Sequence, residues 1–321
     1  MKSKYCLALV TGGAGFIGSH IVDRLVENDF DVKVVDNLSS GRLENLRKPL
    51  NENRILFVKA DIRDPETVKR AVEDVEVVFH EAAFVGGPQS IENPVLANDV
   101  NVNGTLNLLE ASVKCNVKRF ILASSAAVYG EQGTLPIKEG AVPRPSSPYA
   151  VSKLSAEYYS RVYYGSYGLE TVVFRYFNVY GDRQACGPYA VVVTAFLNSL
   201  LGNKQPVIYG DGEQTRDFVN VSDVVDANML AMEKKCAGEV FNVATGSSVK
   251  INKVFRILRS ATGKEQVQPE YAIPRKSDIR ESCADISKIK RILGFRPRIS
   301  FEEGLESLAK SWNRSDLAGA P

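Results

Sequence analysis

Short runs of β-branched and aromatic residues alternate with longer amphipathic stretches through the first half of the chain. Such runs predict strands, and the helical periodicity between them predicts helices. Strands that alternate with helices form parallel, doubly wound sheets, so we predict an α/β Rossmann fold with ligands beyond the carboxyl ends of its strands. The expected strands cover residues 7–11, 31–36, 55–59, 76–80, 119–125 and 171–177.

The hydrophobic pattern becomes less regular after about residue 178. Loops are expected at 181–188 and 209–215, followed by a stretch rich in proline and charge at 268–281. We therefore predict a first domain over residues 1–178 and a smaller α/β domain over residues 179–321. A strand and a helix are predicted near 217–246. The alternative for this segment is that it returns to the first domain.

Charge and cysteine content narrow the classes of partner. The 40 basic and 38 acidic residues give a net charge of +2, without a Lys/Arg run that would favour nucleic acid or membrane surfaces. No window approaches the roughly 18 apolar residues of a membrane helix. Five widely spaced cysteines without a C-x-x-C pair suit a reducing compartment. We expect a cytoplasmic protein with a small-molecule partner and, with only two histidines, no metal site.

Three glycines follow the first predicted strand and precede a helical pattern that runs to residue 27. Gly12 suits a tight turn, Gly15 lets the backbone approach a pyrophosphate, and Gly18 allows close packing of the helix. Asp36 ends the second strand, where a carboxylate binds ribose hydroxyls and repels a 2′-phosphate. The pattern predicts bound NAD, and Arg42 nearby leaves NADP as an alternative.

A serine motif and a Tyr–Lys pair follow the fifth predicted strand. Tyr149 and Lys153 are four residues apart on a predicted helix and share one face. A neighbouring ammonium and a cationic nicotinamide favour the phenolate, so Tyr149 is a candidate base near neutral pH. Ser125 lies at the end of the neighbouring strand.

These motifs together resemble the extended short-chain dehydrogenases/reductases, and among them the UDP-hexose 4-epimerases. The matching segments span nearly the whole chain: the glycine loop, 36–41, 61–62, 80–84, 101–104, 124–130, the Tyr–Lys pair, 175–181 and 210–217.

The resemblance implies a Ser–Tyr–Lys active site. Ser125 and Tyr149 are expected to hold the sugar 4-hydroxyl, Tyr149 to take its proton, and NAD⁺ to receive the C4 hydride. The 4-keto sugar then turns over and is reduced on its other face. Lys153 is also expected to hold the nicotinamide ribose.

The resemblance also implies which residues bind the cofactor and the substrate. Arg216 and Arg275 suit a diphosphate because guanidinium groups offer a planar fork of donors. The cofactor residues are Gly12, Gly15, Phe16, Ile17, Gly18, Asp36, Asn37, Ser40, Gly41, Asp61, Ile62, Ala82, Ala83, Asn101, Ser124, Tyr149, Lys153, Tyr176 and Val179. The substrate residues are Ser125, Tyr149, Asn178, Ala190, Val191, Val207, Ile208, Tyr209, Arg216, Arg275, Asp278 and Ser282.

Two positions separate related activities. Related 4,6-dehydratases carry an Asp–Glu pair where this chain has Ala126 and Ala127, which favours epimerisation. Glucose-restricted epimerases carry a tyrosine where this chain has Ser282, so UDP-N-acetylglucosamine is expected alongside UDP-glucose. A net nucleotide-sugar reductase and a non-catalytic NAD-binding regulator remain as alternatives.

The resemblance also implies a galactose-related, homodimeric enzyme. Relatives pair two helices with their symmetry mates in a four-helix bundle. The corresponding segments here are the apolar-rich helix expected over 94–115 and the tyrosine-rich helix that begins at Tyr149.

Overall fold

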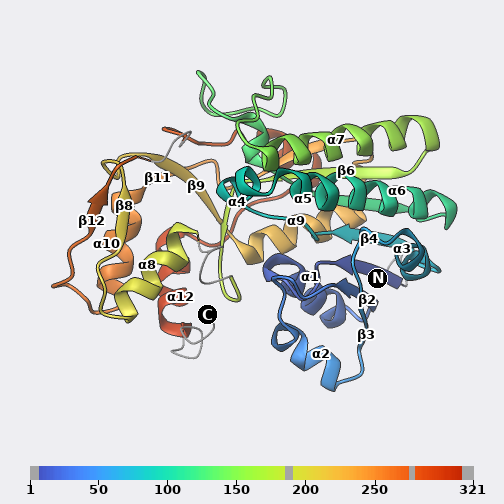
Figure 1. The fold of residues 1–321 in the computed structure, drawn as a ribbon, viewed down its shortest axis with the longest axis horizontal. Coiled ribbons are helices and arrows are strands. Elements are labelled where there is room, and N and C mark those ends of the chain that lie inside the picture. Colours follow the sequence, from blue (N-terminus) through green and yellow to red (C-terminus); the bar gives the residue numbers. More distant parts are fainter. Residues whose placement is uncertain (1–6, 185–190, 275–278, 313–321) are drawn as a thin grey trace.

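A parallel seven-stranded sheet forms the centre of the larger lobe in the computed structural model, which describes residues 7–184, 191–274 and 279–312 (Figure 1). The strand order is β10-β6-β5-β4-β1-β2-β3, and every neighbouring pair is parallel. The predicted doubly wound α/β fold is confirmed. The strands are β1 (Leu7–Thr11), β2 (Asp31–Asp36), β3 (Ile55–Lys59), β4 (Val77–His80), β5 (Arg119–Ser125), β6 (Glu170–Tyr176) and β10 (Val240–Val243).

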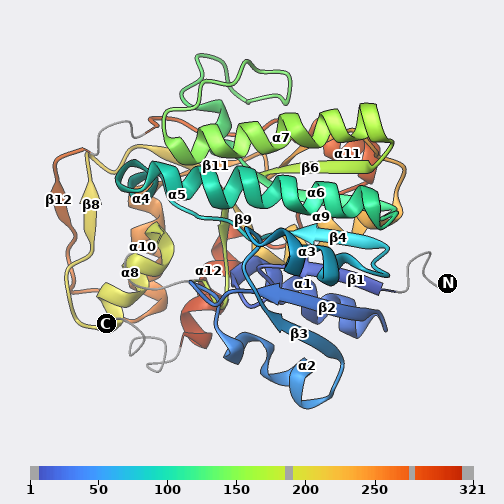
Figure 2. The same cartoon turned by 45° about the vertical axis from the view of Figure 1, so that its right-hand side comes forward.

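Helices cover both faces of this sheet, and each face has its own hydrophobic core (Figure 2). Alternate strand residues serve the two cores: Val77 and Phe79 pack on one side and Val78 on the other. One face carries α1 (Phe16–Glu27), α2 (Arg47–Asn51), α9 (Val221–Glu233) and α11 (Ser287–Leu293). The other carries α3 (Pro65–Val72), α6 (Gly104–Lys114) and α7 (Pro148–Tyr167).

Local signals fix the ends of α7, the long helix expected from Tyr149. Ser147 caps its N-terminus by accepting a hydrogen bond from the Ala150 amide at 3.2 Å, and Pro148 occupies the first turn. Gly168 ends the helix with φ +72°, in the left-handed region that glycine adopts without strain. The Tyr–Lys pair therefore lies in the first two turns of a well-bounded helix.

The helix expected over 94–115 is interrupted. Its parts are α5 (Pro94–Asn98), a π-helical turn over Asp99–Asn103, and α6. Such π-turns are frequent at functional sites. Here the turn contains Asn101, one of the predicted cofactor residues.

The smaller lobe has its own core of aromatic and aliphatic residues. Phe218 and Phe301 stack with ring centroids 4.8 Å apart. β7 (Asn178–Tyr180), β9 (Thr215–Asn220) and β11 (Ser248–Lys250) form one small sheet, and β8 (Val207–Tyr209) pairs with β12 (Glu270–Ala272). The helices of this lobe are α8 (Val192–Leu201), α10 (Ile251–Ala261) and α12 (Phe301–Ser311).

The chain passes between the lobes more than once. After β9, helix α9 packs against α1, and β10 then extends the main sheet beside β6. Within the described ranges, no helix has the length and apolar character needed to cross a membrane. The remaining short elements are the 3₁₀ turns Leu43–Leu46 and Ala126–Tyr129 and helix α4 (Gly87–Glu92).

Candidate active site

The glycine loop after β1 is too tightly packed for side chains. Gly12 has φ +67°, and a Cβ there would lie 2.7 Å from the Ala82 amide nitrogen. A Cβ on Gly18 would lie 2.3 Å from the Gly12 carbonyl oxygen, so this glycine lets α1 pack against the loop itself. Gly15 is the N-cap of α1, where no side chain caps the first turn. The loop is a cradle of backbone amides that suits a pyrophosphate.

Asp36 connects the glycine loop to the segment after β2. Its carboxylate accepts hydrogen bonds from the amides of Ala14 at 3.0 Å and Leu38 at 2.8 Å. Gly41 lies against it, since a Cβ there would be 2.8 Å from Oδ2 of Asp36. Burial raises the pKa of Asp36, and the two amides oppose that shift. The predicted ribose-binding carboxylate is thus held rigidly at the carboxyl end of β2.

Asp61 marks the corresponding edge after β3. Asn37 donates to its carboxylate at 3.0 Å, and Arg63 forms an ion pair with it at 2.9 Å. The Arg63 guanidinium holds the pKa of Asp61 well below its usual range. Ile62 is buried, and its side chain contacts Gly104 on α6. Only the backbone of Ile62 is therefore available to a cofactor.

Asn101, at the π-turn, holds the loop that follows β4. Its Oδ1 accepts from the Phe84 amide at 2.8 Å, and its Nδ2 donates to the Phe84 carbonyl at 3.0 Å and to Ser152 Oγ at 2.9 Å. This side chain joins the segment containing Ala82 and Ala83 to helix α7. Its contacts show a role in positioning that segment, and contact with a cofactor stays a prediction.

Ser125, Tyr149 and Lys153 lie together where β5 ends and α7 begins. Ser125 accepts a hydrogen bond from the Ala127 amide at 3.1 Å, and a further hydrogen bond joins it to Tyr149. One turn along α7, Nζ of Lys153 donates to the Ala123 carbonyl at 2.7 Å. Lys153 is buried, whereas Ser125 and Tyr149 are partly exposed. Ser125 and Tyr149 are thus partly open to solvent, whereas the Lys153 ammonium group is held inside.

Burial raises the pKa of Tyr149, and the hydrogen bond with Ser125 opposes that rise. Ser125 is therefore the contact that favours the phenolate in the structure, and the influence expected from Lys153 stays a prediction. The Lys153 ammonium points instead to the Ala123 carbonyl on β5. Burial lowers the pKa of Lys153 itself to about 8.

Ser124, a predicted cofactor residue, directs its hydroxyl away from Ser125. It donates to the Glu157 carboxylate, which also receives Nη2 of Arg175 at 2.6 Å. All three side chains are buried, and Arg175 lies 4.7 Å from the centre of the Tyr129 ring. This network fixes the end of β5 to β6 and α7.

Tyr176, another predicted cofactor residue, belongs to a second buried network. Its hydroxyl donates to Glu81 at 2.9 Å and accepts from Nδ2 of Asn228 at 2.8 Å. Asn228 lies on α9, so this network ties the opposite face of the sheet to the end of β4.

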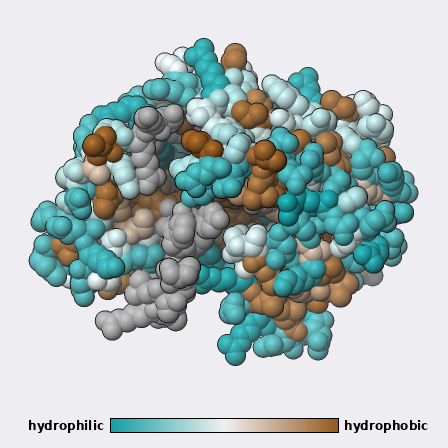
Figure 3. Space-filling model, viewed as in Figure 1, coloured by the Kyte–Doolittle hydropathy of each residue, from teal (hydrophilic) through white to brown (hydrophobic). Residues whose placement is uncertain are grey.

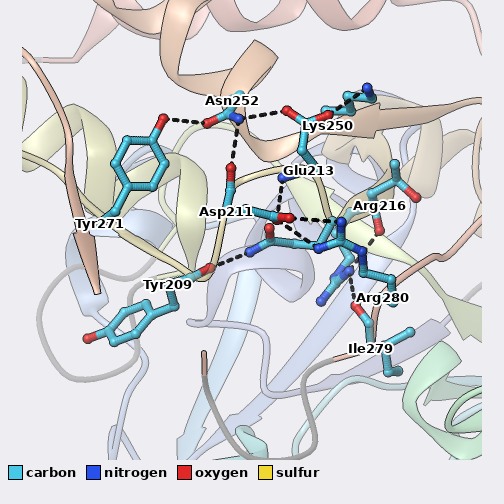
Figure 4. Close-up of polar contacts among 11 residues, drawn as sticks. Tyr209, Asp211, Glu213, Arg216, Lys250, Asn252, Tyr271, Ile279 and Arg280 are labelled. Carbon is cyan, nitrogen blue, oxygen red and sulfur yellow. Dashed lines mark hydrogen bonds and ion pairs between the residues drawn. The ribbon is translucent and has the colours of Figure 1, made fainter. Parts of the chain in front are cut away.

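Two predicted substrate residues of the smaller lobe, Tyr209 and Arg216, lie at the two ends of a polar loop between β8 and β9 (Figure 4). Arg216 donates from Nη1 to the carbonyls of Thr215 at 2.7 Å and Ile279 at 2.6 Å. Asp211 receives both terminal nitrogens of Arg280, at 2.7 and 2.9 Å (Figure 4). Arg216 is therefore anchored by backbone carbonyls, and its binding to a diphosphate stays a prediction.

The rest of the predicted pocket is only partly brought together. Ser282 is 7% exposed, and its amide donates to Thr215 Oγ1 at 3.4 Å. Ile208 is buried in the core of the smaller lobe, so its side chain does not line a pocket. Asn178, Val179, Val191, Val207 and Tyr209 are partly or largely exposed, whereas Ala190, Arg275 and Asp278 lie outside the described residues.

The family model described as GDP-mannose 4,6 dehydratase matches residues 9–308, nearly the whole chain. The chain belongs to this family. Its glycine loop, serine motif and Tyr–Lys pair are the residues on which the resemblance to short-chain dehydrogenases/reductases was based, and that resemblance is confirmed.

The chain is similar to several solved 4-epimerases. The UDP-glucose 4-epimerase of Thermotoga maritima, solved with UDP-glucose, is 44% identical with a TM-score of 0.91, covering 95% of this chain and 97% of that one. The UDP-N-acetylglucosamine 4-epimerase of Methanobrevibacter ruminantium is 42% identical with a TM-score of 0.91, covering 96% and 98%. The UDP-glucose 4-epimerase of Thermus thermophilus, in complex with NAD, is 38% identical with a TM-score of 0.87, covering 98% and 99%.

The hydrogen-bond networks beside the active site of this family member contain three further polar residues that were not predicted. Glu81 contacts Tyr176 and Glu157 contacts Ser124, both predicted site residues, while Arg175 pairs with Glu157. Glu157 continues the four-residue spacing of Tyr149 and Lys153 along α7, a signal that was available in the sequence. Glu81 directly follows the apolar strand β4, where a charged residue at a strand end is a comparable signal.

Proposed function

We propose that the chain is an NAD-dependent UDP-hexose 4-epimerase that interconverts gluco and galacto epimers through a 4-keto sugar. The observation that carries this proposal is the grouping of Ser125, Tyr149 and Lys153 at the carboxyl end of β5, on the same sheet edge as the glycine loop. Substrates of doubly wound sheets bind at this edge.

The residues present fit NAD. Gly12 and Gly18 leave no room for a Cβ against the neighbouring backbone, and Gly15 begins α1 without a side chain where a pyrophosphate would approach. Asp36 offers a carboxylate for ribose hydroxyls and disfavours a 2′-phosphate. Lys153 would contribute its ammonium at the nicotinamide ribose. When bound, NAD would supply an acceptor for the C4 hydride and return that hydride to the keto sugar.

The protein's own contribution is proton transfer and orientation. Ser125 and Tyr149 hold the 4-hydroxyl, and Tyr149 takes its proton and later returns it. The hydrogen bond from Ser125 stabilises the phenolate that this transfer creates. Arg216, on β9 of the smaller lobe, binds the diphosphate of the substrate. Arg275 is predicted to bind the same diphosphate.

Epimerisation is favoured over dehydration by the start of the 3₁₀ turn after β5. Ala126 and Ala127 occupy its first two positions, and neither side chain can donate or accept a proton. Elimination of water from a 4-keto sugar needs an acid and a base at this location.

The proposal is tested by incubating the purified protein with UDP-glucose or UDP-N-acetylglucosamine without added NAD. NMR would resolve the products. Conversion to the 4-epimer supports the proposal, whereas a 4-keto-6-deoxy product or a strict need for added NAD or NADH would contradict it. Failure to convert any UDP-hexose would favour a non-catalytic regulator.

We further propose that N-acetylated UDP-hexoses are substrates, on the evidence of the small side chain at Ser282. This residue is nearly buried beside Thr215 in the smaller lobe. A Ser282→Tyr substitution would fill the space beside the sugar C2 substituent. We expect loss of N-acetylglucosamine turnover by about tenfold or more with smaller loss on UDP-glucose. Equal loss on both sugars would contradict this assignment, and Ser282→Ala is the matched control.

The exposed face of α7 supports the proposed homodimer. Val151, Tyr158 and Val162 are 49%, 55% and 53% exposed and recur at helical spacing. Hydrophobic side chains lie among polar ones over the upper edge of the molecule, where Figure 1 places α7 (Figure 3). Burying this face against a second copy would remove it from water. Sedimentation of the wild type and of Tyr158→Glu would test the pairing, with dissociation of the variant expected.

A further inference from the structure

Glu81 lies at the sheet edge that the Lys153 ammonium on α7 reaches, although the two residues are 72 positions apart in the sequence. β4 and β5 are parallel neighbours, with His80 opposite Leu122. Continuing this register by one residue places Glu81 beside Ala123, whose carbonyl accepts the hydrogen bond from Lys153. The Glu81 amide donates to the Thr11 carbonyl at 3.1 Å, which extends the ladder with β1 in the same way.

The Glu81 side chain is held from the opposite face of the sheet. Tyr176 on β6 donates its hydroxyl proton to Oε1 of Glu81 at 2.9 Å. Asn228 on α9 donates to the Tyr176 hydroxyl at 2.8 Å and to the Val224 carbonyl at 2.9 Å. Because Asn228 supplies the donor to Tyr176, the phenolic proton is directed at the carboxylate.

We propose that Glu81 is a positioning residue of the active site whose carboxylate keeps Lys153 charged while Tyr176 and Asn228 hold that carboxylate in place. The inference rests on the function proposed above, because Lys153 acts as a cation toward the Tyr149 phenolate and the cofactor ribose. The network of Glu81, Tyr176 and Asn228 would then contribute to catalysis as well as to packing.

The electrostatics agree with this geometry. Burial raises the pKa of Glu81 to about 7, opposed by the Tyr176 hydrogen bond and by the Lys153 charge. Burial lowers the pKa of Lys153 to about 8, opposed first by Glu81 and then by Glu157. Each charge therefore stabilises the other, and between these two pKa values both groups are mainly ionised.

Other titratable groups also face this pair. Glu157 on α7 raises the pKa of Lys153, but its carboxylate is already engaged by Arg175 and Ser124. His80 on β4 is neutral, since burial and, to a smaller extent, the Lys153 charge lower its pKa to about 3. Tyr149 on α7 has its pKa raised by Glu81 as well as by burial.

The experiment measures the titration of Lys153 directly. Protein labelled with [¹³C]lysine is titrated by NMR, and the Lys153 resonance is assigned by its absence in Lys153→Arg. Glu81→Gln keeps an oxygen for the Tyr176 hydroxyl but removes the charge. We expect its Lys153 midpoint to fall by about one pH unit, roughly a tenfold change in protonation. Glu52→Gln, at an exposed position beyond α2, is the control and should leave the midpoint unchanged.

Conservative variants separate charge from packing. Glu81→Asp retains the carboxylate and is expected to restore the midpoint at least in part. Should Glu81→Gln fail to fold, Tyr176→Phe serves instead. It removes a hydrogen bond that favours ionised Glu81, so the Lys153 midpoint should move in the same direction by less. An unchanged Lys153 midpoint in every folded variant that neutralises or loosens Glu81 would overturn the proposal.

Turnover supplies an independent readout. In Glu81→Gln the alkaline limb of the kcat profile should move to lower pH by the same amount as the Lys153 midpoint. If the wild type converts no UDP-hexose, the proposed function fails, but the NMR titration still decides whether Glu81 controls Lys153.

Discussion

Replacing Glu157 with Gln tests the buried network beside the catalytic helix. The side chains of Glu157 and Arg175 are 4% and 7% exposed, and Arg175 approaches the carboxylate through Nε at 3.0 Å and Nη2 at 2.6 Å. Glu157→Gln preserves the shape but leaves a buried guanidinium opposite a neutral amide. Removing one partner of a buried ion pair costs about 3–5 kcal/mol. Because Gln still offers one acceptor oxygen, we expect the lower end, about 3 kcal/mol.

This cost converts to a measurable shift in melting temperature. With an unfolding entropy of about 2.1 cal/mol/K per residue, a chain of 321 residues should melt about 4 °C lower. Differential scanning fluorimetry or circular dichroism would measure it. The control is Glu302→Gln, which removes the same charge from an exposed ion pair with Lys253 and should cost about 1 kcal/mol or less. A Glu157→Gln variant that melts no lower than Glu302→Gln would refute the reasoning.

Two further predictions concern the reaction and the pH dependence of folding. Tyr149→Phe should keep its fold, because the hydrogen bond from its amide to Ser90 Oγ at 3.0 Å remains, yet lose about 10²–10⁴-fold in turnover; near-wild-type rates would exclude the phenol as the base. His80 is buried and neutral, so unfolded chains bind a proton more readily below pH 6.5, and stability is lost as pH falls from there toward the folded pKa of about 3. Between pH 6.5 and 5 the wild type should lose about 2 kcal/mol more than His80→Gln in urea unfolding, and equal losses would contradict this account.

Much of the main sheet could be predicted because buried parallel strands are nearly continuous apolar runs. Four of its predicted strands have the observed bounds, while 76–80 begins at Val77 and 171–177 is displaced by one residue to Glu170–Tyr176. The π-turn at Asp99–Asn103 could not be predicted, since the apolar pattern of 94–115 suits one continuous helix. Asn101 lies in that turn, so its hydrogen bonds with Phe84 could not be predicted either.

Those parts of the site could be predicted whose residues lie close together along the chain. Gly12 to Gly18 and Tyr149 to Lys153 are local spacings, and each is tied to one backbone geometry. Other contacts around the site join residues far apart in the sequence. Tyr176 reaches Glu81 because β6 and β4 both lie next to β5 in the sheet. Strand order is a tertiary property that a single sequence does not state.

Two acidic side chains flank Lys153, and their different partners suit different tasks. Glu157 is engaged by Arg175 and Ser124, so its charge is largely compensated and its main effect is on stability. Glu81 receives a neutral phenol from Tyr176, which leaves most of its charge to act on Lys153. Glu157→Gln should therefore lower the melting temperature with little change in the Lys153 midpoint. Glu81→Gln should lower the Lys153 midpoint with a smaller change in melting temperature. Variants that changed both properties in proportion would show that the two acids form one electrostatic unit.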